Sequence, residues 1–248
     1  MRRVFCFALA CLLAAPAVAM VGNAPSAVLS GRHAVMIVGS GGSFCTGAAL
    51  ARDLVLTAAH CVLPGAAYKL VEFDATRRPQ MLDVREIARH PSFNLQTLLG
   101  HRATADVALV KLAAPLPEGI VPATLSRVVR APSAGDRYSV TGYGVAVRGD
   151  GKTSGALRAA SLVATGKPGN LQIRLVDPAT GGSTAGLGAC TGDSGAPVYE
   201  GAALIGLVSW STGPNMTAGC GGITGVTPLA LYRPWIIETA RRMGSPLP

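Results

Sequence analysis

Short runs of strand-forming residues recur along most of this chain, with Gly, Pro, Asn and Asp between them. Many short strands at fairly regular spacing are typical of a β-sandwich or a β-barrel. The 31 glycines and 17 prolines agree with a turn-rich, all-β protein, because both residue types favour turns over element interiors. The clearest runs are residues 34–38, 55–58, 81–87, 106–112, 138–141, 171–176 and 204–210.

Two all-β halves are expected, because the segment 113–122 carries three prolines and no periodic pattern. We take this segment as the connection between an N-terminal barrel, 20–115, and a C-terminal barrel, 123–248. Within the second half, residues 234–243 read clearly as a helix, with a proline in the first turn and two arginines near the end.

Residues 1–19 have the pattern of a cleavable secretory signal. Two arginines precede the apolar run 4–15, and the triplet Ala17-Val18-Ala19 supplies the small residues of a cleavage site. An uncleaved membrane anchor is the main alternative, since 4–21 is just long enough to span a bilayer, and lipid attachment at Cys11 is a minor one. A proline before the triplet favours cleavage. We therefore expect a secreted or periplasmic protein with no stable membrane association after signal cleavage.

The basic residues give no sign of a nucleic-acid partner. The formal net charge of +9 falls to +7 once the two arginines of the signal are removed. The other Lys and Arg residues are scattered, with no run longer than the pairs Arg77-Arg78 and Arg241-Arg242. Because nucleic-acid binding needs a clustered basic stripe or a recognisable module, we expect only a basic solvated surface.

The cysteines indicate two disulfides. An even number in an exported chain is typical of an oxidising compartment, and the sequence itself leaves all three pairings open. The chain has no C-x-x-C, and none of its four histidines lies at metal-ligand spacing from a Cys or Glu. We therefore expect no metal and no cofactor. The four cysteines left after signal cleavage are Cys45, Cys61, Cys190 and Cys220.

Three short stretches carry the residue types of a nucleophilic catalyst. His60 follows an apolar strand, Asp106 opens another, and Ser194 lies among glycines. Each alone has an ordinary structural explanation. A serine hydroxyl, however, becomes a strong nucleophile only when an imidazole accepts its proton and a carboxylate fixes the tautomer of that imidazole. Together the three residues predict a hydrolytic triad.

The stretches TAAHC, DVALVKL and GDSGAP resemble the His, Asp and Ser signatures of the chymotrypsin/trypsin-like serine proteases, in that family's order. The resemblance implies two six-stranded antiparallel β-barrels with a C-terminal helix, in a secreted member of bacterial type. The α/β-hydrolases have the order Ser, Asp, His, and they are excluded because no histidine follows Ser194. Further similarity covers nearly the whole mature chain: FCTG at 44–47, HPSFN at 90–94, GYG at 142–144, SWS at 209–211 and WI at 235–236.

The resemblance also implies roles for neighbouring residues. Gly192 and Ser194 donate the oxyanion-hole N–H groups. Ser209 lies beside Asp106 and helps satisfy that buried carboxylate. The backbone from Ser209 through Trp210 to Ser211 pairs with an extended polypeptide substrate. The implied disulfides are Cys45–Cys61 and Cys190–Cys220.

The specificity pocket departs from the trypsin pattern. Gly188 stands six positions before the serine, where trypsin-like members carry an aspartate for Lys or Arg side chains. An uncharged floor makes burial of an ammonium unfavourable. With Gly188, Ala189, Ser211 and Gly225 lining the inferred pocket, we expect cleavage after uncharged, medium to large apolar residues. Ser211 in place of a glycine, and Ala196 in place of another, are smaller departures.

Two functions are open at this point. The first is a secreted serine endopeptidase that acts on polypeptide substrates as a monomer. The alternative is a catalytically silent homologue that uses the same fold as a binding module. Silent homologues usually lose a triad residue, whereas this chain keeps all three.

The resemblance suggests how the enzyme is activated. In that family a new N-terminus folds inward, and its ammonium pairs with the aspartate before the serine. Here this aspartate is Asp193, and Met20-Val21-Gly22-Asn23 is the only stretch that resembles the required terminus. Signal cleavage after Ala19 is therefore expected to activate the chain directly. The alternative is that Met20 begins a flexible segment and Asp193 finds another partner.

Overall fold

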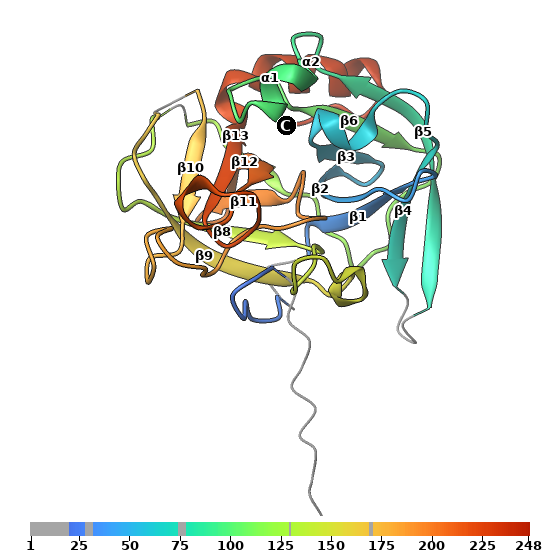
Figure 1. The fold of residues 1–248 in the computed structure, drawn as a ribbon. Coiled ribbons are helices and arrows are strands. Elements are labelled where there is room, and N and C mark those ends of the chain that lie inside the picture. The colour runs from blue at the N-terminus through green and yellow to red at the C-terminus, as the bar shows by residue number, and fades with distance from the viewer. Residues whose placement is uncertain (1–19, 28–31, 74–77, 129, 169–170) are drawn as a thin grey trace, which may run out of the picture.

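The computed structural model describes residues 20–27, 32–73, 78–128, 130–168 and 171–248. Its strands form two barrels that lie side by side (Figure 1). The expected signal, 1–19, lies outside the described residues. Within the described residues, no helix is long and apolar enough to cross a membrane.

The first barrel closes from six antiparallel strands. The order around it is β1 (Ala34–Gly39), β2 (Phe44–Ala51), β3 (Leu54–Thr57), β6 (Ala108–Leu112), β5 (Pro79–Arg89) and β4 (Tyr68–Phe73).

The second barrel also has six antiparallel strands, closed by the pairing of β11 with β12. The short strand β7 (Thr124–Leu125) adds to its outside, parallel to β12. The order around the barrel is β11 (Pro197–Glu200), β8 (Arg137–Gly142), β9 (Arg158–Ala164), β10 (Ile173–Val176), β13 (Ile223–Pro228) and β12 (Ala203–Ser211).

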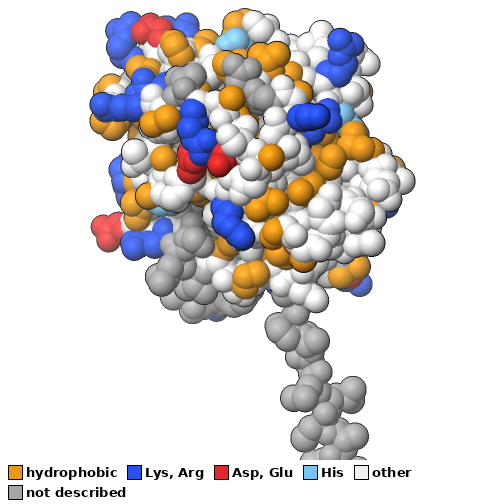
Figure 2. Space-filling view, turned by 90° about the vertical axis from the view of Figure 1, so that its left-hand side faces the viewer, with side chains coloured by type: hydrophobic (Ala, Val, Ile, Leu, Met, Phe, Trp, Pro, Cys, Tyr) orange, Lys and Arg blue, Asp and Glu red, His pale blue; other side chains and the backbone are white. Residues whose placement is uncertain are grey.

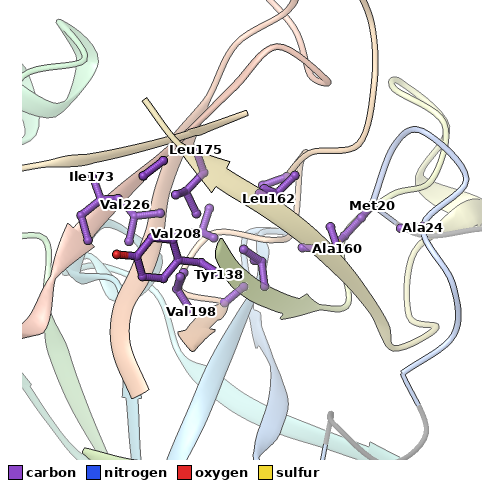
Figure 3. Close-up of a cluster of buried hydrophobic side chains, with 14 residues drawn as sticks. Met20, Ala24, Tyr138, Ala160, Leu162, Ile173, Leu175, Val198, Val208 and Val226 are labelled. Atoms are coloured by element: carbon purple, nitrogen blue, oxygen red, sulfur yellow. The ribbon is translucent and has the colours of Figure 1, made fainter. Parts of the chain in front are cut away.

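Each barrel has its own apolar core, and a third cluster joins the two. Figure 3 shows the core of the second barrel, which includes Met20 beside Ala160. The joining cluster contains Leu54 of the first barrel, Leu204 of the second and Ile236 of the C-terminal helix, all buried. This shared core fixes how the two barrels pack against each other.

The C-terminal helix, α2 (Arg233–Arg242), lies within one residue of the expected position. A shorter helix, α1 (Leu95–Leu99), was not expected. Its N-terminus is capped by Asn94, whose side-chain oxygen accepts a hydrogen bond from Thr97 N at 2.9 Å. The remaining helical turns are the 3₁₀ segments η1 (Ala59–Val62), η2 (Gly151–Thr153), η3 (Pro214–Met216) and η4 (Leu229–Leu231).

The expected strand at 106–112 begins later than the sequence indicates. β6 starts at Ala108, because the chain turns tightly just before it. Asp106 N donates to Thr104 O and Val107 N donates to Ala105 O, both at 2.8 Å. Asp106 thus lies just before the strand and is fully buried.

Candidate active site

The imidazole of His60 is held by the buried carboxylate of Asp106. His60 lies in η1, directly after β3, and Asp106 lies just before β6, the neighbour of β3. His60 Nδ1 is 2.8 Å from Asp106 Oδ2, and His60 N donates to Asp106 Oδ1 at 3.0 Å. These two hydrogen bonds to a fully buried carboxylate hold the imidazole in one orientation.

The second barrel supplies a further donor to that carboxylate. Ser209, near the end of β12, donates from Oγ to Asp106 Oδ2 at 2.5 Å. Asp106 therefore accepts hydrogen bonds from both barrels, which is what a buried carboxylate without an adjacent Lys or Arg requires.

The loop that carries Ser194 is fastened to β2 of the first barrel through Thr46. Thr46 N donates to Ser194 O at 2.8 Å, and Thr46 Oγ1 donates to Gly192 O at 2.9 Å. Gly195 has a φ of +76°, and a Cβ there would stand 2.2 Å from Thr46 O and 2.9 Å from Ala58 N. The serine loop therefore packs against Ala58, which lies two residues before His60 in the chain. Sequence reasoning missed the role of Thr46, because its partners Tyr143 and Gly192 are 97 and 146 residues away and no spacing marks them.

The structure has the hydrogen bond between His60 and Asp106 of the expected triad, but not the one between His60 and Ser194. Among the described residues, His60 Nε2 is 3.9 Å from Cys61 Sγ and makes no hydrogen bond to Ser194 Oγ. Catalytic hydrogen bonds are often long without substrate and tighten when it binds.

Two backbone N–H groups near the serine have no acceptor. Gly192 has a φ of +92°, and a Cβ there would lie 1.9 Å from the Phe44 ring. This left-handed backbone conformation, which only glycine adopts easily, turns the peptide group in this loop. Within the described chain, neither Gly192 N nor Ser194 N donates to another protein atom, so both are available to an oxyanion.

Asp193 is fully buried beside this loop. Its carboxylate accepts hydrogen bonds from Gly144 N and Cys190 N, each at 2.9 Å. Burial raises the pKa of Asp193 to about 7, against the effect of these two donors. Among the described residues, Asp193 forms no ion pair with a cation. A Cβ on Gly144 would stand 2.4 Å from the carboxylate, so glycine is needed for this close approach.

The segment that begins at Met20 lies against the same region. Met20 is fully buried in the core of the second barrel, with a φ of +51°. Val21 pairs with Gly188 in an isolated bridge, and a Cβ on Gly22 would stand 2.5 Å from the Gly186 backbone. The expected pairing of Met20 with Asp193 needs a free amine, and it stays a prediction.

The inferred pocket residues lie along the sheet beside the serine loop. Ala189 N donates to Thr224 Oγ1 at 3.0 Å, and Ser211 Oγ donates to Gly219 O at 3.4 Å. A Cβ on Gly188 would meet Gly221 and Thr224 at 3.3 to 3.4 Å. The carboxylate of Asp177 accepts a hydrogen bond from Leu187 N, the residue before Gly188, at 2.8 Å.

Gly225 faces the Trp210 indole. A Cβ at this position would stand 2.0 Å from the ring. The absence of a side chain therefore makes room for the tryptophan, and this is a role that the sequence did not indicate.

Both disulfides are present in the pairing that the resemblance implied. Cys45 joins Cys61 across 16 residues, and Cys190 joins Cys220 across 30 residues. The first disulfide holds the turn η1, which carries His60, against β2. Cys45, Cys61 and His60 lie close together, but the two sulfurs are bonded to each other and offer no thiolate to a metal.

Two closed six-stranded barrels, a shared interface and a C-terminal helix define the chymotrypsin-like fold. Comparison with known proteins agrees with this class. A family model described as Trypsin matches residues 20–236. The solved structure of mouse neuropsin, described as a serine protease, superposes with a TM-score of 0.66 over 85% of this chain and 95% of that one. The identity is 22%, and this likeness therefore shows the fold alone.

Curated relatives extend the comparison. Kallikrein-4 of Homo sapiens is 30% identical over 208 residues, 80% of this chain and 78% of the relative. The vitellin-degrading protease of Bombyx mori is 30% identical over 233 residues, 88% of this chain and 84% of the relative. The chain belongs to the trypsin family, and it is a serine endopeptidase that acts on polypeptide substrates. These relatives are animal proteins, so the comparisons give no support to the expected bacterial type.

Proposed function

We propose that Ser194, His60 and Asp106 form the catalytic triad, and that the chain hydrolyses peptide bonds through an acyl-enzyme. The observation that carries the proposal is the pair of hydrogen bonds from His60 to the buried Asp106. They fix the orientation of the imidazole, and the Thr46 and Gly195 contacts hold the Ser194 loop against Ala58, two residues before His60 in the chain.

Each side chain then has one task in the reaction. Ser194 Oγ attacks the scissile carbonyl carbon while its proton passes to His60 Nε2. Asp106 stabilises the imidazolium through Nδ1–H and stays ionised. The imidazolium gives its proton to the leaving amine, and water repeats the sequence on the acyl-enzyme. Because Asp106 is buried, its charge acts on the imidazole with little screening by water.

The free N–H groups of Gly192 and Ser194 form the proposed oxyanion hole. Negative charge develops on the carbonyl oxygen as Ser194 attacks, and preorganised donors stabilise it without reorganisation. Loss of one such donor typically lowers the rate by about 10²- to 10³-fold.

The substrate is proposed to add as a strand to the backbone of 209–211, next to the pocket that Gly188, Ala189, Ser211 and Gly225 line. Because Gly188 has no charged side chain at this position of the pocket, cleavage after uncharged residues is favoured. The chain is further proposed to act as a secreted or periplasmic monomer, activated at Met20 by removal of residues 1–19.

Labelling with a serine-directed phosphonate tests the triad. We expect wild type to be labelled at Ser194, and Ser194→Ala and His60→Ala each to lower peptide hydrolysis by several orders of magnitude. The double variant is expected to be scarcely worse than either single one, because each residue needs the other. Ser133→Ala, an exposed serine before β8, is the matched control. Additive losses, or an unchanged rate, contradict the assignment.

A further inference from the structure

A cavity of about 190 Å³ lies where the two barrels meet the C-terminal helix. Leu50 of β2 lines it from the first barrel and Ile237 lines it from α2, while Leu125 of β7 and Leu247 of the C-terminal tail add to its apolar wall. The three leucines also belong to the cluster that joins the barrels or pack against it. None of the residues that line the cavity has a part in the proposed triad or specificity pocket.

Arg233 lines the cavity, and its buried Nε has no hydrogen-bond acceptor among the described residues. Within the same part of the chain, its guanidinium forms no ion pair with a carboxylate. Arg233 is also the first residue of α2, whose first turn has no acidic residue. Because the N-terminal end of a helix carries partial positive charge, a cation there is unfavourable without an anion beside it. The buried donor and the helix end both indicate a negatively charged acceptor beside Arg233.

Arg127, two residues after β7, is the second cation in the cavity wall. Its side chain is exposed, and it forms no ion pair with any carboxylate of the described chain. No Asp or Glu of the described chain lines the cavity. Two guanidinium groups thus share a largely apolar wall. Since a guanidinium donates to both oxygens of a carboxylate, this is the anion that the wall fits best.

The general charge of the surface does not by itself make such a site. The formal net charge of the chain is +9. Figure 2 shows the side of the molecule where β9 and β10 lie, with Lys and Arg side chains spread over it and few Asp or Glu. Anions are therefore attracted weakly to much of the surface, and salt screens this attraction. The cavity differs because an unpartnered buried donor stands beside apolar side chains.

The volume and the wall of the cavity limit the ligand to a small molecule. A dry apolar cavity of about 150 Å³ holds one benzene molecule, so the cavity at α2 accommodates about six to eight carbon atoms. A polypeptide segment would bring backbone N–H and C=O groups against apolar side chains, which is unfavourable without hydrogen-bond partners. A free acid with one carboxylate and an apolar chain or ring has no such groups to satisfy.

We propose that this cavity binds a small apolar monocarboxylate, an aliphatic or aromatic acid of about six to eight carbons. Arg233 binds the carboxylate, Arg127 adds positive charge from the exposed side, and Leu50 and Ile237 enclose the apolar part. Because the wall draws on β2, β7 and α2, the bound acid contacts both barrels and stabilises the folded chain by mass action. The site is independent of the proposed triad.

NMR titration of the full chain with hexanoate, hexanol and acetate tests the proposal, with Ser194→Ala as the background to prevent self-cleavage. We expect hexanoate to bind one site with a Kd of about 0.1–1 mM. Hexanol, which lacks the charge, is expected to bind about tenfold more weakly or worse, and acetate not measurably. Arg233→Gln is expected to weaken hexanoate about tenfold and to leave hexanol unchanged. Arg241→Gln is the matched control, since it removes the same charge from an exposed position of α2 that pairs with Glu238, and it is expected to keep the affinity.

Ile237→Trp fills the cavity and leaves both arginines in place. It is expected to abolish binding of hexanoate and hexanol alike, and it is the deciding variant if Arg233→Gln does not fold. Excess hexanoate is expected to raise the midpoint of thermal unfolding of the Ser194→Ala chain, but not when Ile237→Trp is added. Equal affinities for hexanoate and hexanol, hexanoate binding that either variant leaves unchanged, or no saturable binding below about 10 mM overturns the inference. None of these outcomes bears on peptide hydrolysis, which the labelling of Ser194 tests separately.

Discussion

Ser209 Oγ lies 2.5 Å from Asp106 Oδ2, and this hydrogen bond crosses from the C-terminal barrel to the N-terminal barrel. The same oxygen lies 2.8 Å from His60 Nδ1. The orientation of the carboxylate therefore depends on how the two barrels pack. In the proposed triad, Ser209 is a positioning residue that acts on the reaction through Asp106.

Replacement of Ser209 by alanine is expected to lower kcat about tenfold with a smaller effect on KM. A carboxylate that has lost one donor is held less firmly in the orientation that His60 needs, which lowers kcat. It is also less well satisfied, so it favours the protonated imidazole in the free enzyme. The acidic limb of the kcat/KM profile is therefore expected to move to higher pH. Ser211→Ala, whose hydroxyl contacts the Gly219 carbonyl and no carboxylate, is the comparison, and its profile is expected to keep its acidic limb. Identical profiles for wild type and Ser209→Ala contradict this role.

The serine loop gives a second prediction, based on two glycines with similar backbone. Gly195 and Gly201 have φ values of +76° and +58°, but a Cβ on Gly195 meets Thr46 O and Thr57 Oγ1 at 2.2 Å, whereas one on Gly201 meets open space. Both alanine variants carry the strain of a left-handed residue, about 1–2 kcal/mol. We expect Gly201→Ala to keep its activity. Gly195→Ala is expected to lose most activity, since the loop must leave Thr46. Equal activities argue against the close packing.

The fold was more predictable from sequence than the contacts around the site. The segments expected as strands near residues 34, 55, 81, 138 and 204 all contain strands, because their apolar and β-branched residues alternate with turn signals. β2 escaped prediction because six of its eight residues are buried. Cys45 and Ala49 pack in the first barrel core, whereas Ala48 and Leu50 pack against the second barrel. A strand buried on both faces has no period of two.

Residues that act through long-range packing left no local signal. The cluster in which the His101 ring stacks on Trp210 and Gln172 donates to His101 O draws on three separate segments, and only Trp210 stood in a stretch that resembled the family. The stacking depends on the backbone turn at His101 and on the missing side chain of Gly225. Neither feature follows from residue type or spacing.

The pocket predicts cleavage after uncharged residues. A peptide library is expected to show apolar residues before the cleaved bond, because Gly188 offers no charge to a basic side chain. Gly188→Asp is expected to raise cleavage after Lys and Arg at least tenfold relative to Leu, since a carboxylate then faces the ammonium. A Cβ at this position meets neighbours at 3.3 to 3.4 Å, so a small shift accommodates it. Wild-type cleavage mainly after Lys or Arg shows this view of the pocket to be wrong.

Glu72 makes stability depend on pH. It lies on β4, is 9% exposed, and its Oε1 has no hydrogen-bond partner among the described residues. Burial raises the pKa of Glu72 from 4.5 to about 7. Between these values the unfolded chain binds fewer protons than the folded one, so the free energy of unfolding falls as pH rises from about 4.5 to 7.

Glu72→Gln is expected to remove this pH dependence. At pH 8 the free energy of unfolding of this variant is expected to exceed that of wild type by up to about 3 kcal/mol. Urea unfolding between pH 4 and pH 8 measures the effect, with Ser194→Ala as the background to prevent self-cleavage. Glu86→Gln removes an exposed carboxylate of β5 and is expected to follow wild type. Parallel curves for wild type and Glu72→Gln contradict the prediction.

The last prediction concerns activation at Met20. Asp193 is a buried carboxylate with two backbone donors and no cation among the described residues, and such a charge is costly without a partner. Met20 is buried in the same barrel, and Val21 already pairs with Gly188. A free amine at Met20, with an ordinary pKa of about 8, is cationic at neutral pH and would supply the missing charge.

We therefore expect a protein that begins at Met20 to be active, and one with one or two extra residues before Met20 to have kcat/KM at least 10²-fold lower. The extra residues move the amine away from Asp193 and leave the oxyanion loop unsupported. Asp193→Asn with the authentic terminus is expected to resemble the extended forms. Activity of the authentic form is expected to fall at alkaline pH as the amine loses its proton, since only the ammonium neutralises the carboxylate. If the extended protein is fully active, direct activation by signal cleavage is wrong and Asp193 is stabilised by another group.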